Sequence, residues 1–179
     1  KLVEPTRKGR EMARRADEIL GTPPPELSAL SKKDLETLRR ILGEVDQVEV
    51  LAQEAIEMAR KLAHPFTLAF ALTAASWVYA TLRDAARTFS LAEEAIVVSK
   101  KYSFEVPLAW ATSCQGWAMF DMGNEEGLAK LLKGIAAARE AKASLSHTQI
   151  LAMLADVYLR KQRIDEGVEV IEEALALVP

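Results

Sequence analysis

Cysteine and histidine are scarce in this sequence, and this scarcity limits its chemistry. The 179 residues include one cysteine, Cys114, and two histidines. A single cysteine forms no internal disulfide and excludes a multi-cysteine metal site. No histidine or cation lies within one helical turn of Cys114 to favour a thiolate, so we interpret it as a buried, inert thiol. His64 and His147 each precede an expected helix without converging acidic or thiol neighbours, so we expect them to cap or turn the chain, and we expect no metal site.

Glycine-rich loops and convergent acidic pairs are also missing. The eight glycines are isolated and form neither GxxxxGK nor GxGxxG, the loops that cradle phosphates. The adjacent acidic pairs Glu93-Glu94, Glu125-Glu126 and Glu172-Glu173 each spread over about 100° of a helix and do not converge on a substrate. We therefore predict that the chain is not an enzyme and binds no cofactor.

Long apolar runs and a large excess of one charge are absent as well. The longest apolar candidate, residues 66–80, ends before Arg83 and Asp84 and is shorter than the roughly 18 residues that a membrane-spanning helix needs. The 23 lysines and arginines are interleaved with 26 aspartates and glutamates, which argues against a nucleic-acid partner. The first residues are charged rather than apolar, so we expect no signal peptide. These features predict a cytoplasmic protein without a membrane partner.

Helical periodicity occupies most of the chain. Residues 4–20 carry apolar side chains at a period near 3.6 and are expected to form an amphipathic helix. Gly21 and the prolines at 23–25 interrupt it, so we predict an N-terminal helix with a proline-rich linker (1–25), followed by a helical array (26–179). Gly43 is expected to mark a turn between two helices, the second of which covers 44–63. Further helices are predicted at 66–82, 85–101, 106–122, 125–141, 147–161 and 164–177. The prediction is an all-α fold of about nine helices.

Small residues recur at a nearly constant interval. Ala55, Ala95, Gly134 and Ala174 are separated by 40, 39 and 40 residues. Seven residues before each of them stand Val48, Thr88, Gly127 and Gly167, and the preceding helices carry Ser76, Gly116 and Ala155 at the same interval. Small side chains allow helices to approach closely. We therefore predict four stacked antiparallel helix pairs, at 26–63, 64–103, 104–143 and 144–179.

This pattern resembles the tetratricopeptide repeat. Ala155, Tyr158, Gly167, Ala174 and Pro179 match its small and aromatic positions and its closing proline, although the unit here has 39–40 residues instead of the usual 34. Gln115 stands where the repeat usually has leucine. Longer units of this kind are similar to the arrays of bacterial multidomain signalling regulators that contain ATPase or nucleotide-cyclase modules. The resemblance implies a right-handed superhelix that binds a protein or peptide segment on its concave face.

The resemblance places the first helix of each pair on that concave face. One face of each such helix, at positions −6, −3, +1 and +4 from its small residue, is expected to point inward. The candidate binding residues on these stripes are Phe70, Thr73, Trp77, Trp110, Ser113, Trp117, Phe120, Gln149 and Asp156. Two interpretations remain open: the aromatic side chains pack within the superhelix, or they form an apolar trough for a ligand.

Three functions are compatible with such an array. The first is a scaffold or sensory domain of a larger bacterial signalling protein. The second is a structural module that self-associates through its terminal helices, because the last helix has no following helix in this sequence to cover Val168, Val170, Ile171, Ala174 and Leu175. The third is a small-molecule sensor.

Overall fold

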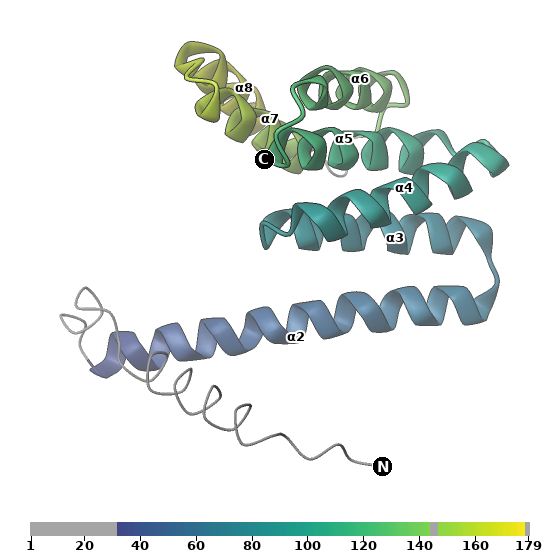
Figure 1. Cartoon of the computed structure of the whole chain (residues 1–179), viewed down its shortest axis with the longest axis horizontal. Helices are drawn as coiled ribbons and strands as arrows, with labels where there is room; N and C mark the ends of the chain where they lie inside the picture. The colour runs from purple at the N-terminus through teal and green to yellow at the C-terminus, as the bar shows by residue number, and fades with distance from the viewer. Residues whose placement is uncertain (1–31, 144–146, 178–179) are drawn as a thin grey trace, which may run out of the picture. The chain divides into compact units, whose positions relative to one another are not determined.

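The computed structural model describes residues 32–143 and 147–177, with side chains from residue 47 onward in those ranges. These residues form helices and turns and no strand, which confirms the predicted all-α class. The chain divides into two compact units, Lys1–Asp46 and Gln47–Pro179, and the described side chains belong to the second. The seven helices of the described residues are α2 (Lys32–Leu62), α3 (Pro65–Thr81), α4 (Ala85–Tyr102), α5 (Glu105–Asp121), α6 (Glu126–Glu140), α7 (His147–Arg160) and α8 (Ile164–Ala176) (Figure 1).

The turn predicted at Gly43 is wrong, because α2 continues through this residue. An internal glycine costs a helix only about 1 kcal/mol relative to alanine, and the neighbouring Leu42 and Glu44 favour helix. Two predicted helices are therefore one, and residues 32–62 do not form the predicted first helix pair. The predicted helix at 4–20 and the boundary after residue 25 lie outside the described residues.

Every helix from α2 to α7 is followed by a residue with positive φ, and these residues recur about every 20 positions. They are Ala63, Arg83, Ser103, Gly123, Lys142 and Gln162. After five of the six, the next amide reaches back over the last helical turn, as when Asp84 N–H donates to the Tyr79 carbonyl at 2.9 Å. A left-handed residue with this hydrogen bond is the Schellman helix ending. The repeated ending gives helical hairpins of similar size at α3–α4, α5–α6 and α7–α8.

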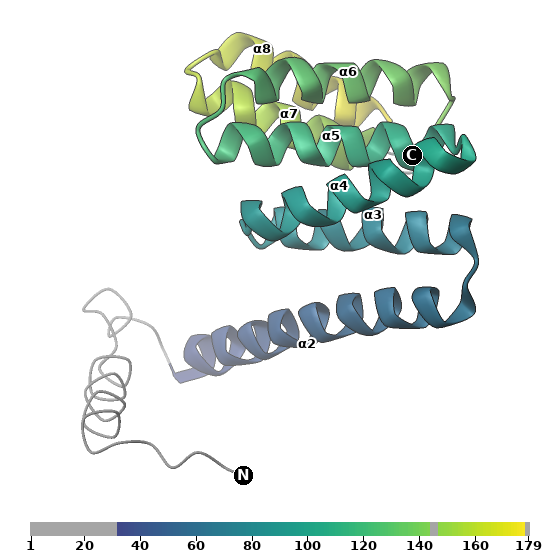
Figure 2. The ribbon, with the colours of Figure 1, turned by 45° about the vertical axis from the view of Figure 1, so that its right-hand side comes forward.

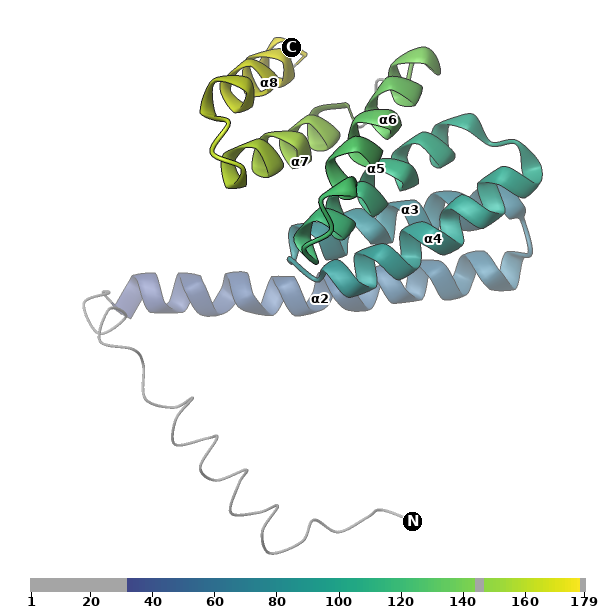
Figure 3. The ribbon, with the colours of Figure 1, turned by 45° about the horizontal axis from the view of Figure 1, so that its top comes forward.

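The contacts between these helices follow a simple order. Helix α5 contacts both α3 and α7, so the three first helices of the hairpins are neighbours. Helix α4 lies against α3 and α5, and α6 lies against α5 and α7 (Figures 2 and 3). The largest buried cluster joins α5, α6 and α7 through residues such as Leu131, Ile150 and Leu151. Side chains of α3, α5 and α7 that point away from the second helices are thus available for one continuous face.

Helices α5 and α6 meet at glycines, as the small-residue pattern predicts. A Cβ atom on Gly116 would lie 2.7 Å from Leu131 Cα and 2.8 Å from the Gly127 carbonyl oxygen. A Cβ atom on Gly134 would lie 2.6 Å from the Ser113 backbone nitrogen. These distances are shorter than van der Waals contact with backbone atoms that cannot rotate away. The glycines therefore set the close spacing of α5 and α6.

Among the described residues, no helix combines the length and the apolar character that a membrane crossing requires.

Candidate binding face

Helices α3, α5 and α7 together line a pocket of about 240 Å³. Four of the sequence-predicted residues meet in it: Trp77 from α3, Trp117 from α5, and Gln149 and Asp156 from α7. Ala80, Thr81, Arg83, Ala152 and Met153 complete the lining. The indoles, alanines and methionine make its walls largely apolar, while arginine, aspartate, glutamine and threonine supply polar groups.

Asp156 is the centre of a hydrogen-bonded network on this face. The two terminal guanidinium nitrogens of Arg83, Nη1 and Nη2, donate to its carboxylate at 2.8 and 2.7 Å. Arg160 donates to Asp156 Oδ2 at 2.6 Å and to Asp121 Oδ1 at 2.7 Å. Trp117 Nε1–H also donates to Asp156 Oδ2, at 3.0 Å. One carboxylate of α7 is therefore bound to α5 and to the turn after α3.

The charge of Asp156 is strongly favoured in the folded protein. Burial alone would raise the pKa of this carboxyl, but hydrogen bonds from Arg83, Arg160 and Trp117 outweigh it and lower the pKa to about 2. Asp156 is consequently ionised at neutral pH and its acceptor capacity is taken up by three donors. It fixes the shape of the pocket and is not available as a general base.

The predicted aromatic residues are mostly packed against one another. Trp110 and Trp117 are 3% and 2% exposed. The Trp110 ring lies 5.2 Å from the Trp77 ring and 6.1 Å from the Phe70 ring. Trp77 is half-buried and Phe70 is 39% exposed, so these two residues of α3 present aromatic surface. The face is therefore packed around Trp110 and Trp117 and accessible at Trp77 and Phe70.

Thr73 and Ser113 lie on the predicted stripes but present no surface. Both are buried, and each hydroxyl donates to a carbonyl of its own helix: Thr73 to Ala69 at 2.8 Å and Ser113 to Ala109 at 3.1 Å. Ser113 also lies directly against Gly134 of α6. At these positions the predicted stripe therefore turns into the helix–helix packing and not toward the open face.

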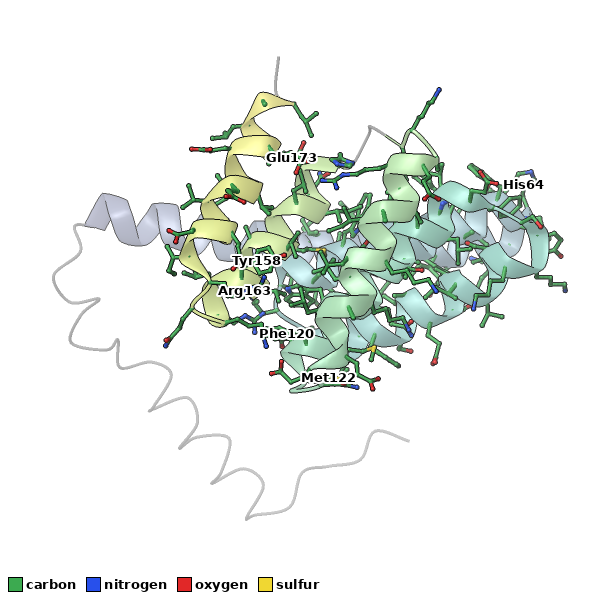
Figure 4. The ribbon with its side chains drawn as sticks, turned by 90° about the horizontal axis from the view of Figure 1, so that it is seen from above. His64, Phe120, Met122, Tyr158, Arg163 and Glu173 are labelled. Carbon is green, nitrogen blue, oxygen red and sulfur yellow. The ribbon has the colours of Figure 1, made fainter. Side chains whose placement is uncertain are left out.

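Phe120 lies beside basic side chains and not in the pocket. Arg160 lies over its ring at 5.5 Å and Lys161 at 5.6 Å, which are cation–π distances. Figure 4 shows Phe120 in the same region as Tyr158 and Arg163, whose guanidinium carbon lies 4.5 Å from the Tyr158 ring centroid. Aromatic and cationic side chains thus lie together where the end of α5 meets the end of α7.

Arg83 and Arg160 are part of this site but were not predicted from the sequence. Arg160 follows Asp156 by one helical turn, a spacing that favours an ion pair and that was a usable signal. Arg83 is 73 residues from Asp156 and occupies a turn at a φ of 62°, so no local pattern indicated its role.

Cys114 and His64 are placed as expected. Cys114 is fully buried, and burial raises the pKa of its thiol to about 12, so it is an inert core residue. His64 caps α3, where its Nδ1 accepts the Thr67 N–H at 3.3 Å. His147 Nε2 lies 3.6 Å from Glu173 Oε1. In the part of the chain that the structure describes, no three histidine, cysteine or acidic residues are grouped as metal ligands.

Comparison with known protein families, curated proteins and solved structures found no match to this chain.

Proposed function

We propose that this chain is a tetratricopeptide-like, right-handed helical repeat without catalytic activity, which binds a protein or peptide segment on the face formed by α3, α5 and α7. The pocket between Trp77, Trp117 and Asp156 is the observation that supports this function. It lies across three successive first helices, where an extended ligand would contact several repeats at once.

The size and lining of the pocket favour a side chain of a peptide over a free small molecule. Its volume of about 240 Å³ is below the range of about 300–1,000 Å³ typical of small-molecule sites. Trp77, Ala152 and Met153 would contact an apolar anchor residue. Gln149 and Thr81 are exposed at the rim and would bond to peptide backbone groups. This arrangement of an apolar anchor within a polar rim is typical of binding hot spots.

A pocket-filling substitution tests this function. Ala152 is exposed and lines the pocket, so Ala152→Phe would occupy the space without disturbing the core. Peptides selected from a random display library on the unaltered protein should bind Ala152→Phe at least about tenfold more weakly, a loss of roughly 1.4 kcal/mol. Ala136→Phe, at an exposed position of α6 away from this pocket, is the matched control. Equal affinity for all three proteins would contradict the proposed site.

The resemblance to signalling arrays extends this proposal to the parent protein. In that setting the chain would act in the cytoplasm as the sensory or scaffolding part of a bacterial signalling regulator, and its ligand would be a segment of a protein.

Self-association is the second candidate function, and the surface of α8 favours it. Val168, Ile171 and Leu175 are 47%, 49% and 65% exposed on this helix. Apolar residues that cover one side of a helix tend to associate. Light scattering at increasing protein concentration should then show dimers or larger species, and Ile171→Glu should reduce them. A strictly monomeric protein would exclude this alternative.

A further inference from the structure

Two ion pairs occupy equivalent positions in the repeat. Arg60 of α2 bonds to Glu94 of α4 at 2.8 Å, and Arg139 of α6 bonds to Glu173 of α8 at 2.5 Å. Each pair joins residues 34 positions apart. In both pairs the arginine stands five residues after the small residue of its own helix, and the glutamate stands one residue before the small residue of its helix. The second helices of neighbouring units are thus joined by the same contact at both ends of the array.

The step between α4 and α6 departs from this pattern. The equivalent positions there hold Lys100 and Lys133, so a pair of like charges replaces the arginine–glutamate pair. At the position of Lys133 the other three units have glutamate: Glu54, Glu94 and Glu173. Like charges at neighbouring positions repel, which leaves this step without its stabilising contact.

Two further departures occur at the same step. Lys130 stands where the other units have Leu51, Leu91 and Val170. Gln115 stands where the neighbouring first helices have the buried apolar residues Ala75 and Leu154. Gln115 is 4% exposed, and its amide is not among the fully buried side-chain groups that lack a hydrogen-bond partner. Packing alone does not explain a polar amide at a buried position that is apolar in the neighbouring first helices.

The residues that depart from the repeat pattern all line one groove. It has a volume of about 1,250 Å³, with α4 and α6 as its walls and α5 as its floor. Gln115, Lys100, Lys130 and Lys133 all contribute to its lining. Apolar side chains such as Ile96 and Leu108 cover much of the remainder. The groove involves neither α3 nor α7 and is separate from the pocket around Asp156.

The groove has its positive charges in the middle and its negative charges toward the ends. On α6 the order is Glu126, Lys130, Lys133, Glu140, so the lysines occupy the middle and the glutamates the ends. On α4, Glu93 precedes Lys100 by two helical turns, and Glu105 begins α5. Burial lowers the pKa of Lys130, and Lys100 and Lys133 lower it further, while Glu93 acts in the opposite direction. The three lysines in the middle of the groove form no ion pair among the described residues.

We propose that this groove binds an acidic peptide segment of a partner protein, with a carboxylate of the segment between Lys100, Lys130 and Lys133 and its backbone at Gln115. The carboxylate would supply the negative partner that glutamate provides in the other units. The volume exceeds that of a typical small-molecule site, and apolar walls with acidic ends suit a chain segment that has basic residues on either side of its acidic centre.

The experiment uses a short fluorescein-labelled peptide with central glutamates, flanking leucines and alanines, and a lysine at each end. A peptide with glutamines in place of the glutamates is the reference. Fluorescence anisotropy at low salt should show that the full chain binds the glutamate peptide at least about tenfold more tightly, and that added salt weakens this binding. Absence of binding, or equal binding of both peptides, would overturn the proposal.

Lys133→Glu restores the residue that the other units have and tests the site itself. This variant should bind the glutamate peptide at least about tenfold more weakly and should melt at a higher temperature than the unaltered protein, because Glu at this position pairs with Lys100. Lys61→Glu, an equal charge change on exposed α2 surface away from the groove, should leave peptide binding unchanged. Undiminished binding by Lys133→Glu would place the peptide elsewhere and refute the groove as its site. Both results are independent of the Ala152→Phe test.

Discussion

Trp117 and Asp156 are joined by a hydrogen bond of 3.0 Å between the indole Nε1–H and Oδ2, across 39 residues and from α5 to α7. This bond links equivalent faces of two successive hairpins. Arg83 and Arg160 donate to the same carboxylate. The candidate pocket owes its form to this contact, because Trp117 and Asp156 both line it.

Replacing Asp156 by a neutral residue should make the free energy of unfolding less dependent on pH in the acid range. The pKa of Asp156 is lowered from 3.8 to about 2 in the folded protein, so its ionised form stabilises the fold above about pH 4, and this contribution is lost as pH falls toward 2. Asp156→Asn should therefore destabilise the protein by about 1 kcal/mol at neutral pH, a value reduced by solvent screening, and by little near pH 2. Urea unfolding across this pH range measures the difference. Asp165→Asn, on the surface of α8, is the control, and a constant difference at all pH values would contradict the expected linkage.

Alanine substitutions at three glycines should have three different effects. Gly116→Ala places a Cβ atom 2.7 Å from Leu131 Cα and should destabilise by about 1–3 kcal/mol through overpacking. Gly123→Ala meets nothing within 4 Å but has a φ of 88°, so it should cost about 1 kcal/mol from backbone strain alone. Gly167→Ala makes only ordinary contacts at 3.7 Å and should stabilise α8 by up to about 1 kcal/mol. Equal effects in thermal unfolding would show that close approach of α5 and α6 does not limit the packing.

The helices from α3 to α8 were predicted better from the sequence than the region of α2 before them. Apolar and small residues repeat at helical spacing from α3 to α8, so local patterns were sufficient there. At Gly43 a single weak signal suggested a turn, and the helix-forming neighbours prevailed.

The candidate site was predictable only in part. Helical spacing brought Trp77, Trp117, Gln149 and Asp156 to one pocket. It did not distinguish Ser113, which lies against α6, from Trp77, which faces the pocket, because that distinction depends on the rotation of α5 and α6 against each other. Arg83 is recruited from a turn 73 residues away, and such a contact is a property of the tertiary structure alone.

Tryptophan fluorescence should reflect a mostly packed face. Trp110 and Trp117 are almost fully buried, whereas Trp77 is half-buried. We expect emission typical of an apolar environment and weak quenching by acrylamide, most of which Trp77→Phe should remove. Trp117→Phe should not reduce the part of the emission that acrylamide quenches, because its indole is not accessible. Strong quenching that persists in Trp77→Phe would show that the face is more open than the packed arrangement described above.

The same substitution at two exposed alanines should change stability in opposite directions. Ala63 follows α2 with a φ of 51°, a left-handed conformation that costs an alanine about 1–2 kcal/mol. Ala63→Gly removes this strain and should stabilise the protein by roughly 0.5–1 kcal/mol, since part of the gain is offset by the greater freedom of glycine in the unfolded chain. Ala136→Gly, within α6, should instead destabilise by about 1 kcal/mol, because glycine is a poor helix former. Denaturant unfolding of the two variants compares them directly. The opposite signs depend only on backbone conformation, so a loss of stability in Ala63→Gly would contradict the left-handed conformation of residue 63.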